Sequence, residues 1–98
     1  MSQNTNITTI DPDFTPLVYT VATSSAQSSA ITTGSGLVRI ATKGCEVHIK
    51  FGTNPTATTS DILIPPNWVE IFSMTSGHKI AFIRSSSSTG DISICAVD

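Results

Sequence analysis

The sequence is short and carries little charge. Its 98 residues are 39% hydrophobic and only 12% charged, with a formal net charge of -2. A chain of this length holds one domain at most. The five basic residues are scattered among seven acidic ones, so no basic stripe is present that would bind the phosphates of a nucleic acid. No apolar run approaches the ~20 residues of a membrane-spanning helix. We therefore expect neither nucleic acid nor membrane as a partner.

The first sixteen residues differ from the rest of the chain. They are polar, and their two prolines restrict the backbone toward extended conformations. Their large apolar side chains, Ile7, Ile10 and Phe14, are spaced so that they form no continuous face. We predict that residues 1–16 form an extended N-terminal arm whose apolar side chains contact a neighbouring protein. The segment lacks the basic and apolar regions of a secretion signal, so synthesis in a cytoplasm is expected.

Residues 17–98 are predicted to form a single β-domain. Short runs of Val, Ile, Phe and Thr alternate with turn-forming Gly, Pro, Asn and Ser, and no helical repeat of apolar residues is present. This spacing is typical of an antiparallel β-sandwich of about seven or eight strands, with a jelly-roll or Greek-key arrangement. The predicted strands are 17–22, 28–33, 36–42, 45–51, 61–64, 68–74, 78–84 and 90–97.

The two strands on either side of Lys43-Gly44 fit a hairpin with a two-residue turn, in which the glycine adopts a positive φ. Ile40 then faces Val47, and Arg39 faces His48. Because side chains alternate along a strand, one face of this hairpin is apolar and the other is charged. The apolar face consists of Val38, Ile40, Cys45, Val47 and Ile49. Cys45 is therefore expected to be a buried thiol.

A second hairpin is predicted around Ser76-Gly77, with Ile71 facing Phe82. Both of its faces carry apolar side chains. A sheet that is apolar on both faces needs a second layer of its own chain or a partner subunit. We predict contact with a partner for three side chains of the first strand, namely Trp68, Phe72 and Met74.

The polar run FGTNPTATTSD, residues 51–61, is predicted to connect two strands, with a crossing from one sheet to the other as one route. Its Thr and Ser side chains can bond to nearby backbone groups. Such a loop keeps its shape without charge, which suits packing against another protein.

No arrangement of catalytic or metal-binding residues is recognisable. Cys45 and His48 are three residues apart, so in a strand they point to opposite faces, and no closely spaced pair of zinc ligands is present. No nucleophile elbow surrounds any serine, and the acids have no spacing typical of paired carboxylates. We expect no enzyme, no catalytic residue, no cofactor and no metal. A carbohydrate-binding module that stacks sugars on Trp68 is an alternative of another class.

From Gly36 to the C-terminus the sequence resembles a group of small β-sandwich proteins encoded among the structural genes of tailed phages. The segments that carry the resemblance are Val38-Arg39-Ile40, Phe51-Gly52, Asn54-Pro55-Thr56-Ala57-Thr58, Ser60-Asp61, Leu63-Ile64-Pro65, Phe72 and Gly77-His78-Lys79-Ile80-Ala81. The resemblance implies a structural protein of the virion without catalysis. We expect a decoration or cement protein that binds the major capsid protein lattice, or another virion protein, as a small homo-oligomer. A neck or tail component is the alternative of the same class.

Overall fold

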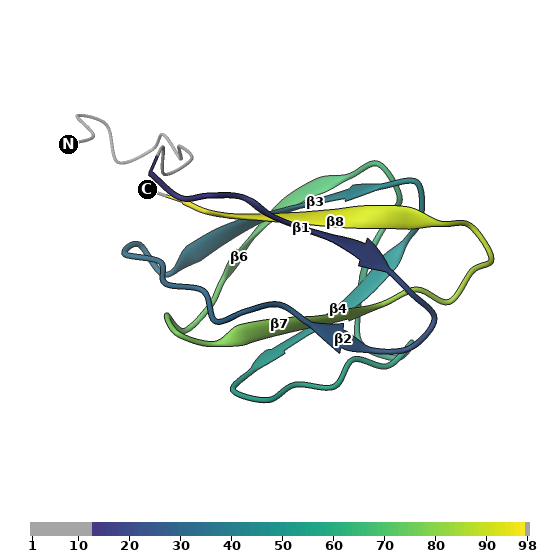
Figure 1. The fold of residues 1–98 in the computed structure, drawn as a ribbon, viewed down its shortest axis with the longest axis horizontal. Helices are drawn as coiled ribbons and strands as arrows, with labels where there is room; N and C mark the ends of the chain where they lie inside the picture. The colour runs from purple at the N-terminus through teal and green to yellow at the C-terminus, as the bar shows by residue number, and fades with distance from the viewer. Residues whose placement is uncertain (1–12, 98) are drawn as a thin grey trace.

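The computed structural model describes residues 13–97, which form two sheets packed face to face (Figure 1). The strands are β1 (Leu17–Val21), β2 (Ala26–Gln27), β3 (Leu37–Lys43), β4 (Val47–Gly52), β5 (Ile62–Ile64), β6 (Val69–Ser73), β7 (Lys79–Ile83) and β8 (Gly90–Ala96). All their pairings are antiparallel. The predicted all-β sandwich is confirmed. Within residues 13–97, no helix has the length and apolar character to cross a membrane.

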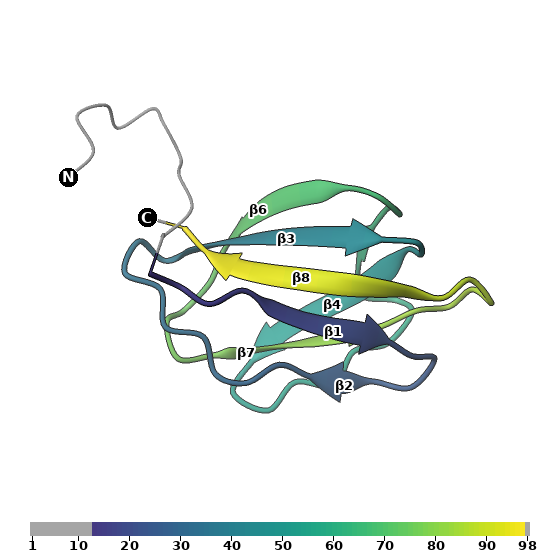
Figure 2. The same cartoon turned by 45° about the horizontal axis from the view of Figure 1, so that its top comes forward.

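The strand order is that of a jelly roll. The first sheet has the order β1-β8-β3-β6 and the second has the order β2-β7-β4-β5. The pairs β1–β8, β2–β7, β3–β6 and β4–β5 are nested, as they are when one long hairpin is wound into two layers. The first sheet lies across the second in Figure 2. In this winding β5 and β6, which follow each other in the chain, become the outermost strands of different sheets.

The predicted hairpin around Lys43-Gly44 is wrong, because β3 and β4 lie in different sheets. Gly44 has a φ of 89°, and the turn it forms carries the chain from one layer to the other. Both strands nevertheless turn their apolar side chains into the same interior, where Ile40 and Val47 are fully buried. Alternation therefore identified the buried side chains correctly, although it assigned the wrong neighbouring strand.

The predicted hairpin around Ser76-Gly77 is wrong for the same reason. β6 belongs to the first sheet and β7 to the second. Ile71 faces Arg39 of β3 instead of Phe82, and Phe82 faces Ile49 of β4. This turn is also a crossing between layers, with Gly77 at a φ of 91°.

The strand predicted at 28–33 is replaced by the two-residue β2, which precedes it. The chain still runs beside β7, where the backbone NH of Ser28 donates to the carbonyl oxygen of Ile80 at 2.8 Å and that of Ile31 to His78 at 2.9 Å. The Ser28 hydroxyl accepts from the backbone NH of Ile80 at 3.0 Å. A side chain thus takes the place of a backbone carbonyl, which interrupts the regular ladder.

The interior between the sheets is formed mainly by β-branched residues. Its buried members are Val21, Ile31, Val38, Ile40, Cys45, Val47, Ile49, Ile64, Ile80, Phe82, Ile92 and Ile94. Cys45 is 1% exposed, so its predicted burial is confirmed, and the two cysteines remain thiols. Phe82 packs against Tyr19 with ring centroids 5.2 Å apart. One continuous core therefore holds the two sheets together.

Residues 53–61 connect β4 to β5, which are neighbours in the second sheet, so this loop does not cross between the sheets. The side-chain amide of Gln27, on the far edge strand β2, donates to Asn54 Oδ1 at 2.8 Å and to the Pro55 carbonyl at 2.7 Å. The backbone NH of Ala57 donates to Ser25 Oγ at 2.9 Å. The loop is therefore fastened across the outer face of the second sheet.

Candidate interaction surface

The six predicted contact residues differ in how exposed they are in the structure. Trp68 is 50% exposed, whereas Phe72 and Met74 are partly buried and pack against the core. Phe14 also packs against the core from the end of the predicted arm. Ile7 and Ile10 lie outside the described residues. The contact of these six side chains with a partner stays a prediction.

Large apolar side chains are exposed mainly along one side of the sandwich. Those with the greatest exposure, between 44% and 62%, are Val18, Ile62, Leu63, Trp68, Val69 and Ile71. All except Val18 belong to β5, to β6 or to the link between them, and we call these five residues the β5–β6 rim. Several exposed apolar side chains on neighbouring elements point to an interaction site, whereas a single one is ordinary.

Four of the five rim residues, Ile62, Leu63, Val69 and Ile71, were missed as contact residues by the sequence analysis. The available signal was the apolar character of residues 61–64 and 68–74 on both strand faces. That signal could not show that these strands lie at the edges of the sheets, because edge position follows from the winding of the whole chain.

Thr42 holds the link between the two halves of the rim. Its side-chain hydroxyl donates to the Pro65 carbonyl at 2.6 Å and accepts from the backbone NH of Trp68 at 3.1 Å. Its own backbone NH donates to the Trp68 carbonyl at 2.8 Å. Thr42 is only 5% exposed, so these bonds are shielded from water and fix the path of residues 65–68.

Asn67 fixes the same link to the Lys43–Gly44 crossing. Its φ of 55° makes it the one non-glycine residue with a positive φ among residues 13–97, a conformation that Asn adopts more readily than most residues. Its Oδ1 accepts from the backbone NH of Gly44 at 3.1 Å. Two of the crossings between the layers, at residues 43–44 and at residues 65–68, are thus joined directly.

Trp68 is oriented by its neighbour on the same face of the strand. Its indole NH donates to Glu70 Oε1 at 3.0 Å. Both side chains are exposed, and they lie on the side of β6 that continues the inner face, since Trp68 and Glu70 are opposite the buried Thr42 and Ile40. The edge strand therefore overhangs the second sheet at this point.

The carboxylates of the described residues serve local structure. Asp61 accepts from the backbone NH of Thr58 at 2.7 Å, and this bond holds the pKa of the Asp61 carboxyl below its usual value. The Ser85 hydroxyl donates to Glu46 at 2.8 Å and lowers the pKa of that carboxyl. Burial raises the pKa of the Cys45 thiol. Each of these pKa shifts is caused by a neighbouring hydrogen-bond donor or by burial.

His48 does not face Arg39 as predicted. It lies on β4 opposite Leu63 and Ile83, and its Nδ1 is 3.1 Å from the Asp61 carbonyl oxygen. No group of three or more His, Cys, Asp and Glu side chains in residues 13–97 is placed to hold a metal ion.

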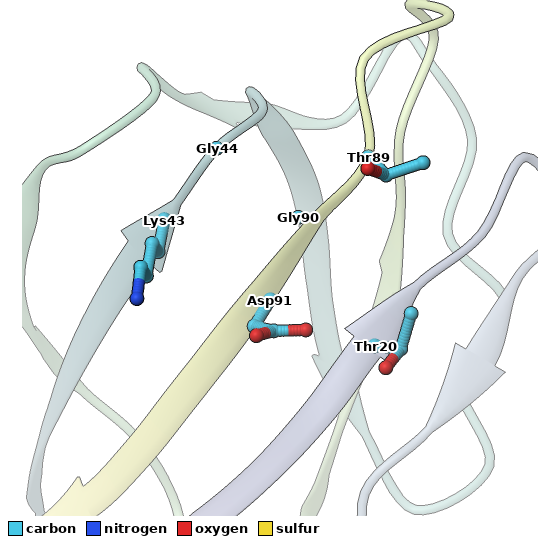
Figure 3. A pocket seen from close by; sticks show the side chains of 6 residues that line it. All are labelled: Thr20, Lys43, Gly44, Thr89, Gly90 and Asp91. Carbon is cyan, nitrogen blue, oxygen red and sulfur yellow. The ribbon is translucent and has the colours of Figure 1, made fainter.

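A shallow hollow of about 310 Å³ lies at one end of the first sheet, lined by Thr20, Lys43, Gly44, Thr89, Gly90 and Asp91 (Figure 3). Asp91 is flanked by Thr20 on β1 and Lys43 on β3. The backbones approach closely here, because a Cβ at Gly90 would lie 2.1 Å from the Lys43 carbonyl oxygen. The hollow has no aromatic lining residue on which a sugar ring would stack, and Trp68 is not part of it.

Comparison with known proteins gives a likeness of fold. No family model and no curated protein matches the sequence. The structure of hydroxypropylphosphonic acid epoxidase from S. wedmorenis, in complex with fosfomycin, is similar with a TM-score of 0.58 and 18% sequence identity. The match covers 87% of this chain and 44% of the epoxidase chain. The chain thus spans less than half the length of the protein it matches.

This likeness corrects one expectation from the sequence. The chain was expected not to be an enzyme, because no catalytic arrangement was recognisable. The epoxidase is an enzyme that shares the fold, so the exclusion of enzymes is overturned. At 18% identity the likeness shows the fold alone, and it assigns no reaction and no substrate to this chain.

Proposed function

We propose that this protein is a structural component of a tailed-phage particle, and that it attaches to the major capsid protein lattice as a decoration or cement protein. The jelly roll is an architecture that viral capsid proteins use, although lectin domains and cupins use it as well. The resemblance of residues 36–98 to phage structural proteins favours the first of these. The fold is therefore compatible with this role, and the exposed side chains of the surface support it.

The observation that carries the proposal is the exposure of Ile62 and Leu63 on β5, at 49% and 56%. These side chains follow directly after the loop at residues 53–61, which is held by Gln27 and Asp61. A fixed loop beside exposed apolar side chains gives a preorganised surface, and preorganisation lowers the entropy cost of binding. Such a surface suits an apolar protein partner better than a charged metabolite.

The resemblance also falls on this part of the molecule. Two of its segments, Asn54-Pro55-Thr56-Ala57-Thr58 and Ser60-Asp61, form the fixed loop, and Leu63-Ile64-Pro65 forms β5 and its exit. Pro55 and Ala57 belong to this loop and are buried. Packing within the chain therefore explains why these two positions are apolar. Leu63 points outward, so packing within the chain does not explain it, and contact with a partner does.

The test is attachment of the purified protein to capsids of the phage that encodes it, measured by co-sedimentation. Leu63→Glu should weaken attachment by about tenfold or more, since burying a Leu side chain contributes about 1.5–3 kcal/mol. Val18→Glu is the matched control, because Val18 is 62% exposed but lies on β1, at the other edge of the fold. It should attach like the unchanged protein.

Copy number in purified particles separates the two structural alternatives. A decoration protein should be present in a fixed ratio to the major capsid protein on a stained gel, and a neck or tail component in only a few copies. If the protein is absent from purified particles, or if Leu63→Glu and Val18→Glu attach equally well, attachment through β5 is wrong.

A further inference from the structure

We propose that two copies of this chain pair antiparallel along β6 about a two-fold axis through Ile71, so that their first sheets join into one continuous sheet. The inference concerns the β6 half of the rim, whereas the proposed attachment uses the β5 half. It requires no capsid, so it stands or fails independently of the proposed function.

The hydrogen bonds of β6 show which of its backbone groups face the open edge. The Trp68 carbonyl accepts from Thr42, and the backbone NH of Met74 donates to Gly36. Residues 68 and 74 therefore direct their backbone groups toward β3. In an antiparallel ladder this direction alternates, so residues 70 and 72 do the same. Val69, Ile71 and Ser73 consequently direct their NH and carbonyl groups away from β3. β6 is the last strand of its sheet, so that side is open.

β6 lacks the features that usually protect an edge strand. Such strands are commonly short, or carry Pro, Lys or a bulge. β5 has three residues and is followed by Pro65, and β2 has only two residues. β6 has five residues, VEIFS, with Glu70 as its one charged side chain. The edge strand β1 is directly preceded by Pro16, and the chain after β2 passes close to it, since the backbone NH of Ser29 donates to the Tyr19 hydroxyl at 3.1 Å.

The open groups of β6 fit those of a second β6 in one register. When the axis passes through Ile71, Ile71 pairs with Ile71 of the second copy and Val69 pairs with its Ser73. All three edge-facing residues then exchange hydrogen bonds. An axis through Val69 would pair Ile71 with Asn67, whose φ of 55° is not that of a strand. An axis through Ser73 would pair Ile71 with Thr75, which lies beyond the end of β6.

The same register suits the side chains. Glu70 faces Phe72 of the second copy, so the two carboxylates are not opposite each other, and like charges directly opposite would be destabilising. Trp68 faces Met74 of the second copy. The predicted contact residues Trp68, Phe72 and Met74 thus all lie along this edge. On the outer face Val69 and Ile71 of both copies form one apolar strip. The half-exposed side chains of β6 are covered by their own counterparts, as a two-fold interface requires.

Association is tested on the isolated protein by sedimentation equilibrium. An interface of one strand pair falls below the ~1,200 Å² of stable complexes, so the series should extend to about 1 mM protein. The unchanged protein should approach twice the monomer mass, and Ile71→Lys should remain monomeric because it places two ammonium groups opposite each other. Val18→Lys replaces an exposed apolar side chain on β1 instead, 62% exposed against 44% for Ile71, and should associate like the unchanged protein.

Register is tested by cross-linking with oxidised glutathione. In a hydrogen-bonded pair the Cα atoms are about 5.5 Å apart, which lies within the ~4.4–6.8 Å range of disulfides. Ile71→Cys should form a covalent dimer. Two Cys side chains at position 69 would lie four residues, or about 14 Å, apart along the strands at ~3.4 Å per residue, so Val69→Cys should not. Cys45 and Cys95 are 1% and 5% exposed and should not compete.

Three results would overturn the pairing: a monomer at every concentration, species larger than a dimer, or equal cross-linking of Val69→Cys and Ile71→Cys. Thermal melting of each variant at low concentration checks that it folds. If Ile71→Lys does not fold, reduced Ile71→Cys replaces it in the sedimentation series. The cross-linking of Ile71→Cys is then the measurement that decides whether the strands pair. Capsid attachment that is lost in Leu63→Glu while Ile71→Cys still cross-links separates the two proposals.

Discussion

The outer faces of the two sheets differ in how far the chain covers them. The outer face of the second sheet is covered by the chain itself, since the loop at residues 53–61 reaches from β4 to Gln27 on β2. Ala81, which points outward from β7, is fully buried there. The outer face of the first sheet leaves Val18, Val69 and Ile71 at 62%, 48% and 44% exposure. Apolar side chains point outward from both sheets, but only the second sheet has a loop of the chain packed over its outer face.

The difference shows what a small domain can do with a long loop. The β4–β5 connection is held by Gln27 and Asp61, so it acts as a third layer over the second sheet without regular structure of its own. The first sheet has no comparable loop among residues 13–97. The exposed apolar side chains of that sheet, together with Leu63 at the β5 edge of the second sheet, are therefore where a partner would gain most from contact.

The largest expected effect falls on the core that both sheets share. Phe82 is 1% exposed and packs against Tyr19. Phe82→Ala should lower the free energy of unfolding by about 3–5 kcal/mol, which is a large part of the total for a domain of this size. Urea denaturation followed by fluorescence and by circular dichroism measures it, and both signals should shift together. Two separate transitions would show that the sheets unfold independently.

Strand positions could be predicted from the sequence, and strand neighbours could not. Seven of the eight predicted strands coincide with observed ones, because alternation of side chains along a strand is a local property. The same alternation is satisfied whether Ile40 lies beside Val47 in one sheet or across the interior from it. Gly44 and Gly77 marked the turns correctly, but a glycine with positive φ serves a crossing as well as a hairpin.

The candidate surface was predictable only in part. The apolar character of residues 68–74 on both faces led to the prediction of a partner, which stays a prediction, and Trp68 of this segment is half exposed. Placing Ile62 and Leu63 at an edge required the complete strand order, which depends on contacts between distant segments. The role of Thr42 had no local signal, because its bonds to Pro65 and Trp68 span more than twenty residues.

The next largest effect should fall on the rim alone. Thr42→Val keeps the shape of the side chain but removes the hydroxyl that bonds to Pro65 and Trp68. The loss of these bonds should lower the free energy of unfolding by about 1–3 kcal/mol. Hydrogen exchange should increase at the backbone NH groups of Asn67 and Trp68, since Pro65 and Pro66 have none. Thr20→Val, at an exposed position on β1, is the control and should change stability by less than about 0.5 kcal/mol. Equal effects of the two variants would contradict the role of Thr42.

The covered face should resist added volume. Ala81→Val introduces two methyl groups beneath the loop, where Ala81 has no exposed surface. Overpacking of this kind should cost about 1–3 kcal/mol in unfolding free energy, measured by urea denaturation. A variant as stable as the unchanged protein would show that the loop moves away easily, and the contrast between the two outer faces would then be weaker.

Acid should loosen the cover of the second sheet. The pKa of Asp61 is lowered, mainly by the bond from the Thr58 backbone NH. A lowered pKa in the folded state gives stability that is present above the usual pKa of 3.8 and is lost as the pH falls through the folded value. The protection of the Thr58 NH, taken relative to the intrinsic exchange rate at each pH, should therefore fall below about pH 4. Asp61→Asn should remove most of this pH dependence, and an unchanged profile would exclude Asp61 as the cause.

The smallest effect on stability is expected on the open face, and it completes the contrast with Ala81. Ile71→Thr keeps a β-branched side chain on β6 and replaces surface that is already 44% exposed. At protein concentrations of a few micromolar, where strand pairing is negligible, unfolding free energy should change by less than about 0.5 kcal/mol. The same variant should weaken self-association, because the apolar strip along the paired strands becomes polar. A loss of stability as large as that of Ala81→Val would mean that Ile71 is packed within the monomer. The open face would then be part of the domain's own structure, and β6 would not be a surface reserved for a second copy.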